Sequence, residues 1–99
     1  MAQVVREPQL ERFVENDLSR LLGFWRGVPE LAEEWPEWDE HSRLNVIHDW
    51  PLERAALSRV KKAAKIGLLD ERQQRDWQEL LRLIETHRAT VEWMLEGPI

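Results

Sequence analysis

The sequence predicts an all-α protein of four to five helices, folded as a single helical domain over residues 1–99. Apolar residues recur at three- and four-residue steps along most of the chain, as they do on one face of a helix. Prolines and glycines separate these periodic stretches. No stretch alternates apolar and polar residues over a useful length, as a half-buried strand does. Ninety-nine residues can bury one core, which excludes a two-domain enzyme with a cofactor fold.

The amino-terminal third predicts one long and one short helix. We expect the long helix over about 8–22, ending near Gly23, and a short helical turn over 30–35 that Pro36 ends or kinks. The apolar stripe of the long helix contains Leu10, Phe13, Val14, Leu18, Leu21, Leu22 and Trp25.

The middle of the chain predicts two helices. The first covers about 40–49, with Asp39 as its N-cap. The second covers about 51–66, because a proline such as Pro51 is favoured in the first turn of a helix. Gly67 follows where a left-handed C-terminal cap is expected.

The last helix covers about 71–95 and begins with Asp70 and Gln73 at capping-box spacing. With the helix over 51–66 it should form an antiparallel αα-hairpin on which the fold is built. The inward face of the helix over 51–66 is small, which predicts a close approach of the two helix axes. That face consists of Ala56, Val60, Ala63 and Ala64.

Charge is unevenly distributed along a chain whose net charge is −5. Residues 28–50 carry seven acidic side chains and one basic one, whereas residues 51–66 carry five basic side chains and one acidic one. Either the acidic segment folds back toward the basic one, or each block is a solvated face, or one block meets a charged partner. The overall acidity argues against a generic nucleic-acid coat and against docking on an anionic membrane.

The lack of cysteine and the lack of long apolar stretches both limit the class of protein. The chain has no cysteine, which excludes disulfide scaffolds, thiolate metal sites and thiol catalysis. No stretch approaches the ~18 apolar residues of a membrane-spanning helix, and no apolar run of signal-peptide length follows Met1. We therefore expect a cytoplasmic protein.

The aromatic composition is unusual, as the uneven charge distribution is, because the chain has six tryptophans and no tyrosine. Trp25 and Trp77 lie on apolar stripes and are expected in the core. The other four suit a core and a protein interface equally well, because tryptophan buries a large area with little loss of rotamer entropy. The candidate partner interface consists of Trp35, Trp38, Trp50, Trp93, Met94 and Leu95.

No motif for catalysis or metal binding is convincing. Glu37, His41, Asn45 and His48 share one face of a helix, but the two histidines lie two turns apart, about 10 Å. A polar solvent-exposed face explains this spacing without a metal ion. No serine lies in a strand-turn-helix elbow and no glycine-rich phosphate loop occurs. We expect no enzyme activity, no metal and no cofactor.

The sequence therefore favours a protein-protein interaction module: an adaptor, regulator or assembly factor that binds another protein or a second copy of itself as a homodimer. A nucleic-acid-binding or nucleic-acid-mimicking regulator is the first alternative, and a metal-binding helical protein is the second. Nucleic-acid binding would use a candidate electrostatic patch. That patch consists of Arg54, Arg59, Lys61, Lys62 and Lys65.

Overall fold

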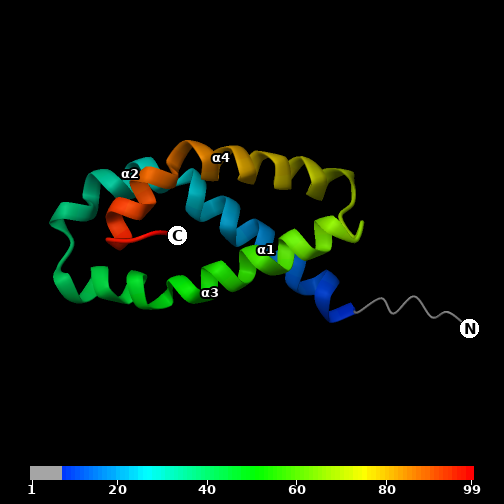
Figure 1. Ribbon diagram of the computed structural model, residues 1–99, viewed down its shortest axis with the longest axis horizontal. Helices are drawn as coiled ribbons and strands as arrows, with labels where there is room; N and C mark the ends of the chain where they lie inside the picture. Colours follow the sequence, from blue (N-terminus) through cyan, green and yellow to red (C-terminus); the bar gives the residue numbers. More distant parts are fainter. Residues whose placement is uncertain (1–7) are drawn as a thin grey trace, which may run out of the picture.

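The computed structural model describes residues 8–99, which form four α-helices and one 3-10 turn without any strand (Figure 1). This confirms the predicted all-α single domain. The elements are α1 (Pro8–Arg26), α2 (Val28–Glu34), η1 (Trp35–Glu37), α3 (Glu40–Lys65) and α4 (Glu71–Leu95).

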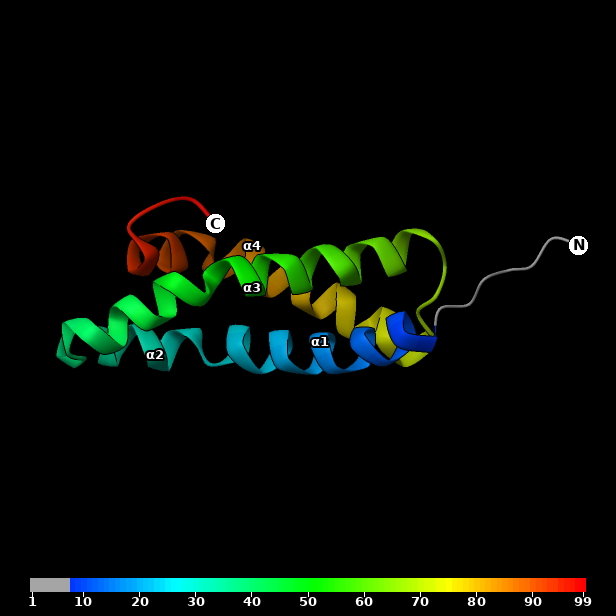
Figure 2. The same cartoon turned by 90° about the horizontal axis from the view of Figure 1, so that it is seen from below.

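The helices build an elongated molecule that measures 57 × 23 × 19 Å along its principal axes. Figure 1 shows α3 and α4 along opposite edges, with α1 crossing the gap between them. Figure 2, turned by 90°, shows α1 and α2 end to end along one side and α3 along the other. The last helix, α4, spans most of the length, so its carboxyl-terminal turns pack on the domain at the end formed by α2 and η1.

Three end signals read from the sequence are confirmed. The backbone N–H of Ser42 donates to Asp39 Oδ1 at 2.6 Å, which caps α3. Asp70 and Gln73 form a capping box, in which each side chain accepts from the other residue's backbone N–H. Gly67 adopts a φ of +78° after α3, and this left-handed conformation lets the following N–H groups bond back to the last turn.

The first helix continues three residues beyond the predicted end near Gly23. A Cβ at Gly23 would meet nothing within 4 Å, so the glycine is not required by a close contact. Glycine inside a helix costs about 1 kcal/mol. Continuing the helix places Trp25 in the core, 1% exposed, and burial of so large a side chain outweighs that cost.

The predicted break at Pro51 is wrong, because α3 runs as one helix through it. Proline inside a helix removes one backbone hydrogen bond and crowds the preceding turn. Here the helix bends along its length (Figure 2) and still buries Trp50, whose ring lies 5.5 Å from that of Phe24 and 6.2 Å from that of Trp25. This aromatic packing holds both halves of α3 against α1.

The two long helices form the expected antiparallel hairpin, but their predicted close approach is wrong. They meet near the turn, are separated along their middle where α1 packs against both, and approach each other again at the far end, where both line one pocket (Figure 1). The small residues Ala56, Val60 and Ala63 are fully buried, and they allow a close approach of α3 to the core that α1 supplies.

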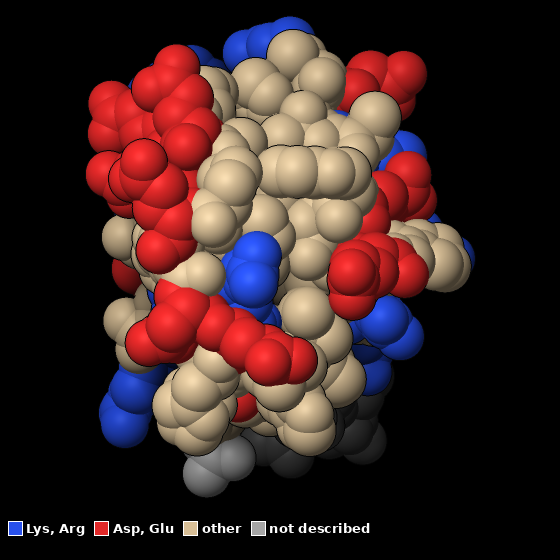
Figure 3. Space-filling view, turned by 90° about the vertical axis from the view of Figure 1, so that its left-hand side faces the viewer, with Lys and Arg blue, Asp and Glu red and all other residues tan. Residues whose placement is uncertain are grey.

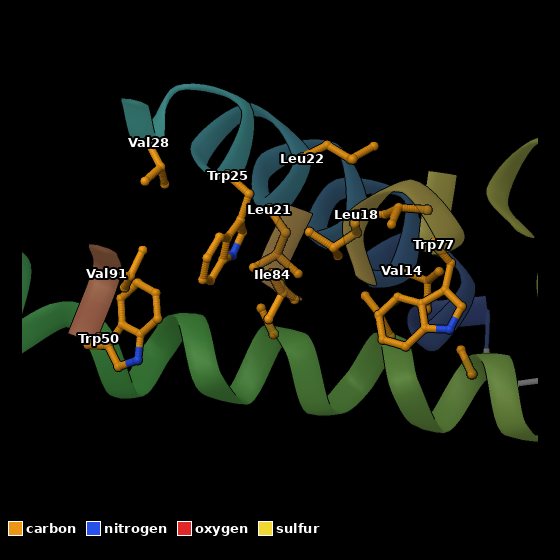
Figure 4. Packing of buried hydrophobic residues seen from close by; sticks show 14 of the residues in the cluster. Val14, Leu18, Leu21, Leu22, Trp25, Val28, Trp50, Trp77, Ile84 and Val91 are labelled. Atoms are coloured by element: carbon orange, nitrogen blue, oxygen red, sulfur yellow. The ribbon is translucent and has the colours of Figure 1, made fainter. Parts of the chain in front are cut away.

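Side chains of α1 fill the space between α3 and α4, as Figure 4 shows for Leu18, Leu21 and Trp25. The predicted stripe of α1 is largely confirmed, since Val14, Leu18, Leu21, Leu22 and Trp25 are all buried. Phe13 is the exception at 51% exposed, and it lies under the Arg59 guanidinium, 6.0 Å from the ring centre. The side chain of Leu10 lies outside the part that the structure describes.

Candidate functional site

Divergence of α3 and α4 leaves an open groove of about 1310 Å³ between them, here called the hairpin groove. On α3 the buried stripe Ala56, Val60 and Ala63 faces the core. The stripe one residue further along, Leu57, Lys61 and Ala64, lines the groove. Because one residue turns a helix by about 100°, these two stripes are neighbouring faces of the same helix. The groove is thus a direct result of the way α1 separates the hairpin.

The hairpin groove combines an apolar floor with a basic rim. Its apolar lining residues are Leu57, Ala64, Leu69, Trp77, Leu81 and Ile84. Leu81 is the most exposed of these apolar residues, at 40%. Five cationic side chains line the groove beside a single carboxylate, that of Glu71. The cations are Lys61, Lys65, Arg75, Arg82 and Arg88.

Most of these cations form no ion pair with the carboxylates of residues 8–99. Within residues 8–99, no ion pair involves Lys61, Lys65, Arg75 or Arg88. Arg82 is close enough to Glu79 to help lower the pKa of that carboxyl, after the larger effect of its hydrogen bonds with the Arg26 guanidinium. The groove therefore presents an uncompensated positive charge over an apolar surface.

Other arginines are used to fix α1 in place. Arg72 Nη2 donates to both carboxylate oxygens of Glu15 at 2.6 and 2.7 Å, and Gln73 Nε2 donates to Oε2 at 2.7 Å. The hydrogen bonds from Gln73 and Arg72 lower the pKa of the Glu15 carboxyl. These contacts join the start of α4 to α1 on the side of α4 away from the hairpin groove, so the groove's own cations are not needed to hold the helices together.

A partly buried ion pair joins α1 to α3. Asp17 is 5% exposed and accepts from Arg59 Nε at 2.7 Å and Nη2 at 3.1 Å. The hydrogen bonds to Asp17 raise the pKa of the Arg59 guanidinium. This paired geometry removes Arg59 from any surface patch, because its charge is already neutralised.

A second depression lies at the other end of the hairpin, between the start of α3 and the end of α4. This terminal pocket has a volume of about 280 Å³, and Trp35 and Met94 are its buried lining residues. Trp93 and Leu44 also line it, at 56% and 43% exposed. Figure 3 faces this end, where carboxylate side chains lie on both sides of an uncharged strip that one basic side chain interrupts.

The structure brings three of the six predicted interface residues together, since Trp35, Trp93 and Met94 all line the terminal pocket. Trp35 and Met94 are 5% and 2% exposed and offer little contact area. Trp38 is half-buried, with its ring 5.6 Å from that of Trp35.

The remaining two predicted interface residues pack inward. Trp50 is 6% exposed and belongs to the core with Phe24 and Trp25, and Leu95 is half-buried against that core. Trp93 is thus the one broadly exposed aromatic side chain among the candidates.

The predicted electrostatic patch is divided between different surroundings. Lys61 and Lys65 line the hairpin groove, whereas Arg59 pairs with Asp17. Arg54 lies beside Trp50 and Ile99, and Lys62 is exposed outside the groove. The five residues therefore do not form one face.

The α4 helix contributes three basic residues to the groove, and sequence reasoning missed two of them, Arg82 and Arg88. Arg75 and Arg82 stand seven residues apart, which is two helical turns, and this spacing was the available signal. It indicates a shared face but not which surface that face meets.

The acidic segment does not fold back onto the basic one. Residues 40–50 and 51–65 belong to one helix of about 39 Å, so the two blocks of charge are held apart along its axis. In the described part of the chain, no ion pair joins a carboxylate of residues 28–50 to any basic side chain. The acidic block keeps its charge available at the surface, and the basic block does so except at Arg59, which pairs with Asp17.

Residues 8–99 contain neither a metal cluster nor a membrane-spanning helix. No group of three or more His, Asp or Glu side chains is placed to hold a metal ion there, and no helix is long and apolar enough to cross a membrane. Comparison of the chain with protein-family models, curated proteins and solved structures gives no match.

Proposed function

We propose that this protein is a protein-protein interaction module, an adaptor, regulator or assembly factor, that binds an acidic amphipathic helix of its partner in the hairpin groove. The observation that carries the proposal is the combination of an apolar floor with five cations and one carboxylate. Helix-in-groove recognition uses such a floor for the apolar face of the ligand. The basic rim then favours ligand carboxylates on either side of that face and sets the register.

The length of the groove suits a helix of ordinary size. Its lining residues on α4 run from Glu71 to Arg88, which is about 26 Å of helix at 1.5 Å per residue. A ligand helix of about 17 residues would match this length. Such an interface is smaller than that of a stable complex, so we expect a dissociation constant on the order of 10 µM.

Protein is favoured over nucleic acid by the floor of the groove. Phosphate recognition needs cations but no apolar surface. Leu81 is 40% exposed in the lining of the groove and would gain nothing from contact with a charged phosphate backbone. It does gain from contact with an apolar helix face.

Fluorescence anisotropy of a labelled synthetic helix tests the proposal. The peptide has about 18 residues, with Leu along one face and Glu on both sides of it, and a second peptide replaces every Glu by Lys. We expect the acidic peptide to bind at least about ten-fold more tightly than the basic one. Lys61→Glu with Lys65→Glu should weaken binding about ten-fold. The matched control, Arg54→Glu with Lys62→Glu, makes the same charge change outside the groove and should change binding less than about three-fold.

Three results would contradict the proposal. Equal binding of the two peptides would show that the basic rim does not select carboxylates. An equal loss of peptide affinity in both double variants would show a general effect of net charge and not a binding site in the hairpin groove. Tighter binding of an oligonucleotide duplex than of the acidic peptide would assign the groove to phosphate recognition.

A further inference from the structure

We infer that the terminal pocket and the carboxylates around it are a second interaction surface, and that this acidic end docks in the hairpin groove of a second copy of the chain, head to tail. The inference rests on the proposed function, because it names an occupant for the same groove. The inference also assigns a role to the acidic end of the molecule, for which the proposed function gives none.

The acidic end has the complementary pattern to the groove. Trp93 and Leu44 supply exposed apolar area, and the charged side chains in the lining of the terminal pocket are those of Glu40, Glu96 and Arg43. Carboxylates continue on both sides of the uncharged strip in Figure 3, which one basic side chain interrupts. A mainly acidic end with exposed apolar side chains therefore meets an apolar groove flanked by cations.

Charge excludes the two symmetric arrangements. A dimer that joined groove to groove would set the five cations of one copy against the same five of the other. A dimer that joined end to end would oppose the seven acidic side chains of residues 28–50 on each copy. Like charges across an interface are strongly unfavourable, so only the contact between an end and a groove is complementary.

The two surfaces lie apart on each copy. Leu44 and Lys61 belong to the terminal pocket and the groove respectively, and about 25 Å of α3 separates them. A copy docked through its acidic end therefore still presents its own groove. Heterologous contacts of this kind extend into chains or close into rings, so the association is not limited to a homodimer.

Sedimentation velocity tests the inference with the full chain and two double variants. Wild-type protein at about 500 µM in low salt should show a mass that rises with concentration and falls at about 500 mM salt. The groove variant, Lys61→Glu with Lys65→Glu, and the end variant, Glu40→Lys with Glu96→Lys, should each be monomeric. Circular dichroism of each variant confirms that it is folded.

Mixing the two variants is the decisive step. The groove variant keeps an intact acidic end and the end variant keeps an intact groove, so the mixture should restore the contact between these two surfaces. We expect a mass of at least twice the 11.9 kDa chain mass, whereas each variant alone stays at the chain mass. The control pair, Arg54→Glu with Lys62→Glu, should associate as the wild type does.

A monomeric wild type, a monomeric mixture, or self-association that survives in the groove variant would each overturn the inference. If the wild type is monomeric while the acidic peptide binds the groove, only the second copy is excluded as occupant. If the peptide also fails to bind, the proposed function fails with it.

Discussion

Removal of Arg59 should destabilise the fold, because it leaves the buried carboxylate of Asp17 on α1 without its main partner. Asp17 is 5% exposed and receives two hydrogen bonds from Arg59, at 2.7 and 3.1 Å. The other cation near it is Arg20, whose Nη2 lies 3.6 Å from Oδ1. In Arg59→Met the carboxylate keeps only this longer contact.

The magnitude follows from the burial of the two partners. Breaking a fully buried ion pair by removing one side costs about 3–5 kcal/mol. The Arg59 side chain is 41% exposed, so water can reach the vacated position and solvate part of the carboxylate. We therefore expect a loss of about 2 kcal/mol in the free energy of unfolding, or about 8–16 °C in Tm for a domain of this size.

Urea unfolding followed by far-ultraviolet circular dichroism measures this loss. Arg54→Met is the matched control, since Arg54 is exposed on the same helix and forms no ion pair within residues 8–99, and it should cost less than about 0.5 kcal/mol. The double variant Asp17→Leu with Arg59→Met removes both charges and should recover part of the stability. A loss below about 0.5 kcal/mol in Arg59→Met, or a double variant as unstable as the sum of its parts, refutes the reasoning.

Three further outcomes follow from burial, pKa and capping. Trp25→Ala should lower the free energy of unfolding by about 3–5 kcal/mol, because the Trp25 side chain is 1% exposed. Trp93 is 56% exposed, so Trp93→Ala should lower it by less than about 1 kcal/mol. Similar losses in the two variants would contradict the assignment of Trp25 to the core and Trp93 to the surface. Hydrogen bonds lower the pKa of the Glu15 and Glu79 carboxyls below their usual 4.5. The stability that these two carboxylates contribute is therefore present above about pH 4.5 and is lost as the pH falls through their lowered pKa values. The urea midpoint of the double variant Glu15→Gln with Glu79→Gln should therefore fall less steeply in acid than that of the wild type. Asp70→Ala removes the capping box of α4 and should cost about 1 kcal/mol in the same unfolding assay, and an unchanged midpoint would show that the cap adds nothing.

Features that depend on a few neighbouring residues could be read from the sequence. The cap at Asp39, the capping box at Asp70 and the left-handed turn at Gly67 are satisfied by backbone groups within about one helical turn. The apolar spacing along α1 likewise located its buried face, since it depends only on the helical period. Lys61 and Lys65 were included in the predicted electrostatic patch because both lie in the basic stretch of one helix.

Features that depend on packing between distant segments were decided only by the tertiary structure. Pro51 has a strong local preference to begin a helix, and only the burial of Trp50 against α1 carries α3 through it. The hairpin groove exists because α1 holds α3 and α4 apart, and this brings Arg82 and Arg88 beside the two lysines. The sequence by itself therefore determined the helices, their caps and the separate blocks of charge, all of which are local properties. The tertiary structure decided which faces remained uncovered, because that depends on the total apolar area each helix can bury against the others.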